Sequence, residues 1–136
     1  MPSDEPVLLD THVLLWWQAR SDRLSRRART RLADAATLLI SPITCWEVGM
    51  LVARGKVSLD RPTAAWVRDV LANDRVELAE LTAGTAVTAS ELDGFHGDPA
   101  DRLLYATARH HQAALLTKDR LIHRYAKTDP TVLAVW

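Results

Sequence analysis

The sequence predicts a single α/β domain whose mostly parallel sheet of about four or five strands is flanked by helices. Short, continuous apolar runs recur along the chain, and stretches with helical spacing lie between them. Such runs are typical of strands that are buried on both faces of a sheet, and the alternation of strands with helices favours parallel strands. The length of 136 residues fits one domain, residues 1–136, which can bury a core without disulfides.

The predicted strands and helices alternate along the chain. Apolar runs predict four strands, at residues 7–10, 37–41, 114–117 and 131–136, and a fifth run that alternates apolar with acidic residues lies at 76–81. Helical spacing predicts five helices, at residues 25–36, 42–53, 63–72, 82–92 and 99–111. The last of these helices has a clear start, because Asp98 suits the N-cap and Pro99 the first helical position.

Acidic residues stand where the predicted strands end and the helices begin. Asp10 ends the first strand, Asp119 lies just past another, and Glu47 lies among apolar residues near the start of a helix. Asp10 alone could serve as a helix cap, whereas an acid with apolar neighbours, such as Glu47, needs a cation or a metal as its partner. Ligands of open α/β sheets bind outside the carboxyl ends of the strands, so these acids predict a site at that edge.

Two further acids occur together in the segment Asp98-Pro99-Ala100-Asp101. As the N-cap, Asp98 would accept a hydrogen bond from the backbone near Asp101 and hold the turn. Asp101 would then project from the first helical turn and face the site, although helix starts are commonly acidic for structural reasons alone. Acids from four segments would repel one another unless a divalent cation lay between them. Carboxylate oxygens favour Mg²⁺ or Mn²⁺ over zinc.

These motifs resemble those of the PIN-domain ribonucleases and, within them, the VapC toxins of toxin–antitoxin pairs. The resemblance runs nearly end to end, and it rests on Leu8-Leu9-Asp10-Thr11-His12, on Ser41 with Trp46-Glu47, on residues 96–104 (HGDPADRLL) and on Leu116-Thr117-Lys118-Asp119. It implies that the catalytic and metal-binding residues are Asp10, Glu47, Asp101 and Asp119, with Thr11 and Thr117 as supporting polar groups. It also implies a Mg²⁺-dependent endoribonuclease that acts on structured RNA such as tRNA, a homodimer, and neutralisation by a cognate antitoxin.

The expected reaction is hydrolysis of a phosphodiester by a metal-activated water, which needs no nucleophilic side chain. His12 and His96 flank the acids and are expected to orient them or to pack, because histidine ligation favours softer ions. A receiver-like phosphoacceptor domain would also place an Asp after its first strand, but it leaves Glu47 unexplained. An inactive PIN-like RNA-binding module is the other alternative, and we would expect it to have lost one of the four acids.

The charge pattern limits how RNA could bind. Seventeen basic residues balance 17 acidic ones, so binding would depend on a local patch or on metal ions. Lys118, Arg120 and Arg124 are the candidates for RNA contacts because they lie near Asp119, whereas the arginines of residues 20–31 are better explained as a solvated helix face. The acidic N-terminus does not resemble a signal peptide, and no apolar run is long enough to span a membrane, so we expect a cytoplasmic protein.

Overall fold

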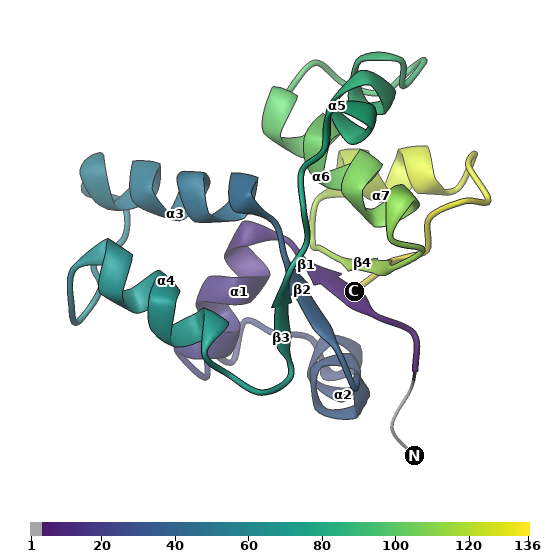
Figure 1. Ribbon diagram of the computed structural model, residues 1–136. Helices are drawn as coiled ribbons and strands as arrows, with labels where there is room; N and C mark the ends of the chain where they lie inside the picture. Colours follow the sequence, from purple (N-terminus) through teal and green to yellow (C-terminus); the bar gives the residue numbers. More distant parts are fainter. Residues whose placement is uncertain (1–3) are drawn as a thin grey trace.

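A computed structural model describes residues 4–136, so that residues 1–3 of the predicted domain lie outside the described part. One sheet of five parallel strands forms its centre, in the order β3-β2-β1-β4-β5 (Figure 1). The strands are β1 Val7–Leu9, β2 Leu38–Ile40, β3 Val76–Leu78, β4 Ala114–Leu116 and β5 Ala134–Val135. The predicted α/β fold with a parallel sheet is therefore confirmed, with five strands in the described part of the chain.

Seven helices connect these strands within residues 4–136 and cover both faces of the sheet (Figure 1). They are α1 Thr11–Gln18, α2 Arg26–Asp34, α3 Pro42–Ala53, α4 Thr63–Leu71, α5 Ala83–Ser90, α6 Pro99–His110 and α7 Arg120–Ala126. None of the helices in this part of the chain is long and apolar enough to cross a membrane.

The strand order creates a crevice at the centre of the sheet. From β1 the chain moves outward through β2 to β3, and it then returns to place β4 on the opposite side of β1. The connections on the two sides of β1 therefore run in opposite directions, which makes the β1–β4 boundary a topological switch point. Ligands of open α/β sheets bind at such a point, outside the carboxyl ends of the strands.

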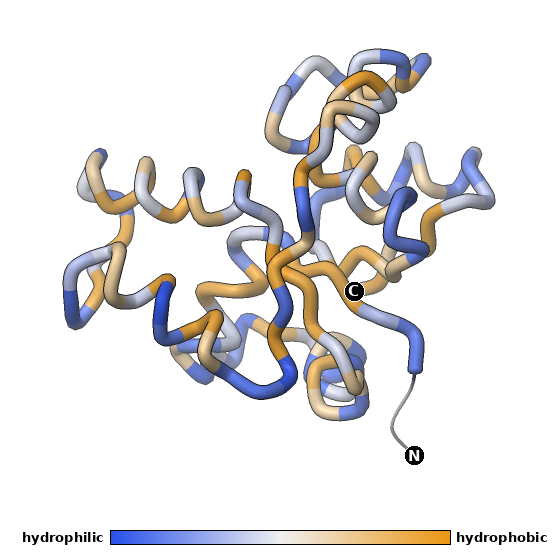
Figure 2. Tube along the Cα trace, viewed as in Figure 1, coloured by the Kyte–Doolittle hydropathy of each residue, from blue (hydrophilic) through white to orange (hydrophobic). Residues whose placement is uncertain are grey.

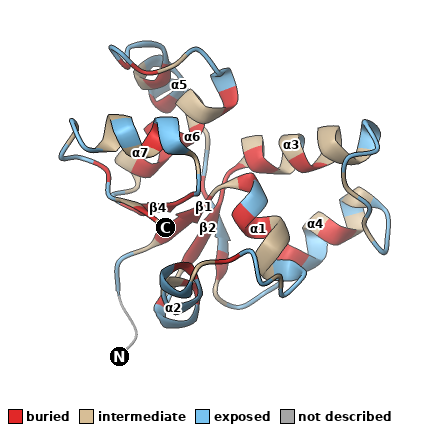
Figure 3. Ribbon diagram, turned by 180° about the vertical axis from the view of Figure 1, so that it is seen from behind, coloured by how far each residue is buried: buried red, intermediate tan, exposed pale blue. Residues whose placement is uncertain are grey.

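The core consists of two apolar layers, one on each face of the sheet. Alternate residues of β1 point to opposite faces, so that Val7 and Leu9 join one layer and Leu8 joins the other. The first layer packs under α1, α2, α3 and α4, and the second packs under α6 and α7. Figure 2 shows the apolar strands at the centre, and Figure 3 shows that β1, β2 and β4 are buried. This double burial explains why the strands are continuous apolar runs.

All five predicted strands are present but shorter than predicted, and β1 and β2 end early because the polar residues at their ends cap the following helices. Asp10 and Ser41 are not strand residues but the N-caps of α1 and α3. The prediction is also incomplete, since it gives no bounds for α1 or α7. Both helices are short, and α1 is apolar or aromatic on most sides, so neither shows the periodicity on which such predictions depend.

Candidate active site

Asp10 lies at the switch point, between the ends of β1 and β4. Its Oδ1 accepts a hydrogen bond from the backbone N–H of Thr11 at 2.7 Å, which caps α1. Its Oδ2 accepts one from the hydroxyl of Thr117, just past β4, at 2.6 Å. Burial raises the pKa of the Asp10 carboxyl, although these two hydrogen bonds oppose the rise. Asp10 therefore combines both functions that the sequence left open, a helix cap and a half-buried carboxylate at the sheet edge.

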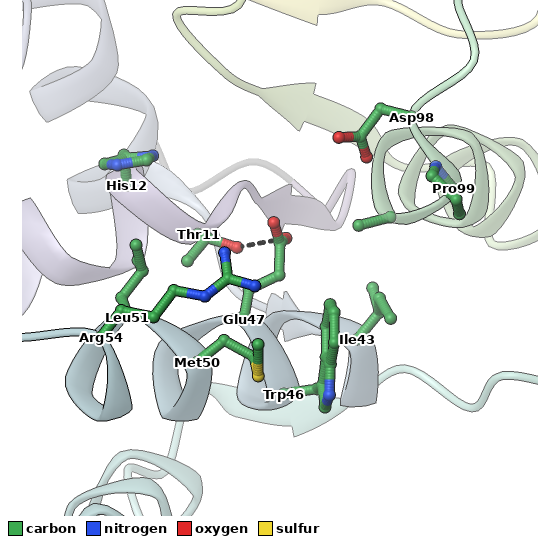
Figure 4. Close-up of a pocket in the computed structure, with 11 residues that line it drawn as sticks. Thr11, His12, Ile43, Trp46, Glu47, Met50, Leu51, Arg54, Asp98 and Pro99 are labelled. Atoms are coloured by element: carbon green, nitrogen blue, oxygen red, sulfur yellow. Dashed lines mark hydrogen bonds between the residues drawn. The ribbon is translucent and has the colours of Figure 1, made fainter. Parts of the chain in front are cut away.

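Glu47 reaches the same edge from α3. Its Oε1 accepts a hydrogen bond at 2.7 Å from the hydroxyl of Thr11, which is itself buried (Figure 4). Burial raises the pKa of Glu47, and the nearby charges of Asp10 and Asp101 raise it further against the effect of the Thr11 hydrogen bond. The two threonines that the resemblance names as supporting groups thus each donate to one carboxylate.

Asp98 and Asp101 occupy different positions at the start of α6. Asp98 is the N-cap, and its Oδ1 accepts a hydrogen bond from the backbone N–H of Asp101 at 3.0 Å. Asp101 lies one turn in, where its Oδ2 is 2.8 Å from Nε2 of His96. Burial raises the pKa of Asp101 to about 6, and the charges of nearby carboxylates contribute to the rise while the His96 contact opposes it.

Asp119 begins α7, as the acid just past β4. Its Oδ1 accepts hydrogen bonds from the backbone N–H groups of Leu121 and Ile122, at 2.8 and 3.1 Å. Its own N–H donates to the hydroxyl of Thr117, which in turn donates to Asp10. The charge of Asp119 contributes to the raised pKa of both Asp10 and Asp101, so it lies within electrostatic range of both.

The four predicted acids form a loose group rather than a closed set of ligands. Within residues 4–136, no three His, Cys, Asp or Glu side chains lie close enough together to hold a metal ion as they stand. The donor set still suits a hard divalent cation, because the four acids come from four separate elements and none of them forms an ion pair with Lys or Arg in the described part of the chain. Binding an ion would require these side chains to turn toward a common point, and it would offset their repulsion.

A hollow of about 480 Å³ opens beside Glu47. Its walls come from α1, α3 and the start of α6, and its α3 wall includes the apolar side chains of Ile43, Trp46 and Met50 (Figure 4). The Trp46 side chain is unusually open for its size, with 56% of its surface exposed. Figure 4 shows Asp98 across the hollow from Glu47. The site therefore joins acidic groups to an apolar space that is large enough for a ring.

Arg102 is a residue whose importance could not be recognised from the sequence alone. Its guanidinium donates to five backbone carbonyls at the end of α5 and in the loop that follows it, those of Ala89, Ser90, Leu92, Phe95 and His96. These bonds tie the loop that carries His96 to the same helix that carries Asp101. The one available signal was the place of Arg102 in the motif, four residues after the cap Asp98.

The three candidates for RNA contacts lie together outside the acidic group. Lys118, Arg120 and Arg124 are exposed, and all three line a second hollow of about 620 Å³ next to the edge strand β5. The two sites are joined by the connection from β4 to α7, in which Asp119 lies between Lys118 and Arg120.

Known proteins are similar to this chain in sequence and in fold. The PIN domain sequence pattern matches residues 7–128. Ribonuclease VapC22 of Mycobacterium tuberculosis (strain ATCC 25618 / H37Rv) is 38% identical over 131 residues, which is 96% of this chain and 98% of that protein. The crystal structure of VapBC2 from Rickettsia felis, bound to a DNA fragment from its promoter, superimposes with a TM-score of 0.64 at 17% identity, covering 96% of this chain and 97% of that one.

A toxin–antitoxin complex from Klebsiella pneumoniae is similar in fold, with a TM-score of 0.62 at 21% identity and coverage of 93% of this chain and 95% of that one. At these identities the two solved structures establish the fold, while the sequence match covers nearly all of a VapC ribonuclease. The chain therefore belongs to the PIN-domain family, and within that family to the VapC-type ribonucleases.

Proposed function

We propose that this chain is a Mg²⁺- or Mn²⁺-dependent endoribonuclease that acts as the toxin of a toxin–antitoxin system. The observation that carries the proposal is the group of four carboxylates without Lys or Arg partners, gathered at the switch point of the sheet in the described part of the chain. The relative at 38% identity is named a ribonuclease, which supports the same class of reaction. The substrate is RNA, with structured RNA such as tRNA as the first candidate, in the cytoplasm.

The proposed ion-binding residues are Asp10, Glu47, Asp101 and Asp119. A bound Mg²⁺ or Mn²⁺ supplies an activated water and offsets the charge of the scissile phosphate. Thr11 and Thr117 hold two of the carboxylates in fixed orientations by donating hydrogen bonds to them. His96 holds Asp101 in the same way, and the helix cap at Asp98 fixes the turn from which Asp101 projects.

The hollow beside Glu47 suits the nucleotide next to the scissile phosphate. A base could stack on the exposed ring of Trp46, and stacking of this kind tolerates any base sequence. Arg54 also lines this hollow and forms no ion pair within residues 4–136, so its guanidinium is available to a phosphate. Substitution of Trp46 with alanine should therefore weaken RNA binding more than it slows cleavage at saturating RNA.

A cognate antitoxin is the proposed protein partner. The structural neighbours include complexes that are described as VapBC2 and as a toxin–antitoxin complex. A homodimer is also proposed, since exposed apolar side chains away from the hollow beside Glu47, such as Leu78 and Val87, would be covered at an interface. Sedimentation at micromolar concentration tests the dimer, and a fully active monomer would show that dimerisation is not required.

The two acids at the start of α6 give the sharpest test of the site. Asp98→Asn keeps a good capping group, because Asn and Asp rank nearly equally at the N-cap, so this variant should retain substantial cleavage. Asp101→Asn keeps the shape of the side chain but removes a charge from the proposed ion site, so it should lose most cleavage while remaining folded. Cleavage at saturating Mg²⁺ and melting are measured for both variants. An inactive Asp98→Asn with an active Asp101→Asn would reverse the two assignments.

The alternatives explain less of the site. A receiver-like phosphoacceptor domain has no use for Glu47, which lies at the same edge as Asp10 and shares Thr11 with it. An inactive PIN-like RNA-binding module has no need for four carboxylates at one sheet edge. Burial raises the pKa of Asp101, the charges of neighbouring carboxylates add to the rise, and both effects cost stability at neutral pH.

A further inference from the structure

A strongly basic surface lies beside the acidic site. We use the name basic hollow for the space of about 620 Å³ that is lined chiefly by Arg27, Lys118, Arg120, Arg124, Lys127 and Trp136. Its residues come from α2, from the connection between β4 and α7, from α7 itself, and from the chain around β5. Seventeen basic residues balance 17 acidic ones in the whole chain, so this concentration of cations is local.

The cations of the basic hollow lack carboxylate partners. Within residues 4–136, none of these five Lys and Arg side chains forms an ion pair, whereas four other arginines do, namely Arg31, Arg61, Arg68 and Arg109. The one acid in the adjoining segment, Asp119, turns an oxygen to the backbone at the start of α7 instead. Five unpaired cations around one hollow create a locally positive potential that attracts an anion of several charges.

The basic hollow also provides an aromatic surface. Trp136 is half-buried and packs on Trp16, with the ring centroids 5.8 Å apart. The ammonium of Lys118 lies 5.8 Å from the centroid of the Trp16 ring. A groove of cations that includes an aromatic ring is typical of sites for single-stranded nucleic acid, in which the cations hold phosphates and the ring stacks on a base.

The basic hollow lies next to the acidic site, and two features link them. Lys118 and Arg120 flank Asp119 in the sequence, and Asp119 lies within electrostatic range of Asp10. Arg124 also lines a third hollow that contains His96, the residue that contacts Asp101. A strand of RNA with its scissile phosphate at the acids could therefore continue along α7 into the basic hollow.

We propose that the basic hollow binds the sugar–phosphate backbone of a single-stranded segment of the RNA substrate, on one side of the cleavage point, with a base stacked on Trp136. This proposal rests on the proposed function, because it assumes that RNA is the substrate. It goes further by assigning most of the RNA affinity to residues that are separate from the acids.

RNA affinity without turnover tests the proposal independently of cleavage. The affinity for a fluorescent single-stranded RNA of 12 nucleotides is measured in EDTA over a series of salt concentrations. The test variant is R120Q/R124Q/K127Q. All three positions are exposed and lie in α7 or directly after it, where glutamine is a good helix former. The matched control is R23Q/R26Q/R29Q, which removes the same number of exposed charges from α2 and the segment before it.

The test variant should bind at least about tenfold more weakly at moderate salt. Its plot of log affinity against log salt should be shallower by about 2, because each neutralised phosphate of a single strand adds about 0.7 to the slope and the variant neutralises three fewer. The control should stay within about twofold of the wild type. Trp136→Leu should weaken binding at least about fivefold without changing the salt slope, because stacking releases no counterions.

Equal weakening in the test and control variants would overturn the proposal in favour of a diffuse charge effect, and unchanged affinity of the test variant would overturn it outright. A wild type that binds RNA in this way but never cleaves it would contradict the proposed function while leaving the basic hollow in place. A wild type that cleaves RNA, with a test variant that binds normally, would contradict the basic hollow alone.

Discussion

Replacing Thr117 with valine should destabilise the fold without changing its shape. The Thr117 side chain is fully buried, and its hydroxyl donates to Oδ2 of Asp10 at 2.6 Å while accepting the N–H of Asp119 at 3.0 Å. Valine occupies nearly the same volume, but it leaves a carboxylate oxygen and a backbone N–H without these partners. Leaving a buried donor or acceptor without its hydrogen-bond partner costs the full free energy of desolvating that group.

The size of the effect depends on the two hydrogen bonds. A bond to a charged group contributes about 1.5–3 kcal/mol and a bond between neutral groups about 1 kcal/mol. The free energy of unfolding should therefore fall by about 2–4 kcal/mol, measured by urea denaturation in EDTA at neutral pH. In a domain of this size each kcal/mol lowers the melting temperature by about 3–5 °C, so thermal melting gives a second measurement.

Thr44→Val is the matched control for this substitution. The Thr44 hydroxyl is equally buried but has no hydrogen-bond partner within residues 4–136. The same change at this position removes an unpaired polar group, so the free energy of unfolding should stay the same or rise by about 1 kcal/mol. Equal destabilisation of the two variants would contradict this explanation, because it would show that the contact with Asp10 contributes nothing beyond packing.

Three further perturbations test other parts of the structure. Arg102→Met removes the donor to five backbone carbonyls of α5 and the following loop. It should lower the free energy of unfolding by about 2–4 kcal/mol in urea, and an unchanged midpoint would contradict this. For Asp129, burial would raise the pKa, but hydrogen bonds from surrounding groups, Arg109 among them, hold it well below its usual range. This carboxylate therefore stabilises the fold above about pH 4. The melting temperature of Asp129→Asn should lie furthest below that of the wild type at pH 7, and the difference should shrink as the pH falls below about 4. Asp101 changes the stability with pH in the opposite direction, because its pKa is raised to about 6. In EDTA the wild type should lose stability as the pH rises from about 4 to above 6, on the order of 1–2 kcal/mol, and Asp101→Asn should lose less over the same range. Melting curves with and without Mg²⁺ at pH 7.5 should show that the ion restores part of this stability in the wild type.

Local chemistry explains which parts of the fold could be predicted from the sequence. Runs such as residues 7–9 are apolar because both faces of the sheet are covered, so five strands were recognisable. The start of α6 was recognisable because Asp98 and Pro99 act within a single turn. The ends of β1 and β2 were misplaced by the same kind of residue, since Asp10 and Ser41 cap helices and do not extend the strands.

Contacts between distant segments could not be predicted in this way. The acids could be named from their positions at strand ends and helix starts, but the bond from Thr117 to Asp10 joins residues 107 apart in the sequence. It exists because β4 returns to lie beside β1, and no local pattern specifies that pairing. The unpaired cations around α7 are likewise a property of the fold, because their isolation from carboxylates depends on what packs nearby.

The ends of RNA cleaved by the purified protein test the proposed metal mechanism most directly. With Mg²⁺ or Mn²⁺ we expect products that carry a 5′-phosphate and a 3′-hydroxyl, because a metal-activated water attacks the phosphate in line. No products should form in EDTA, and Asp101→Asn should yield few. Full cleavage in EDTA, or products that end in a 2′,3′-cyclic phosphate, would contradict the proposal that these carboxylates cleave RNA by holding a metal ion.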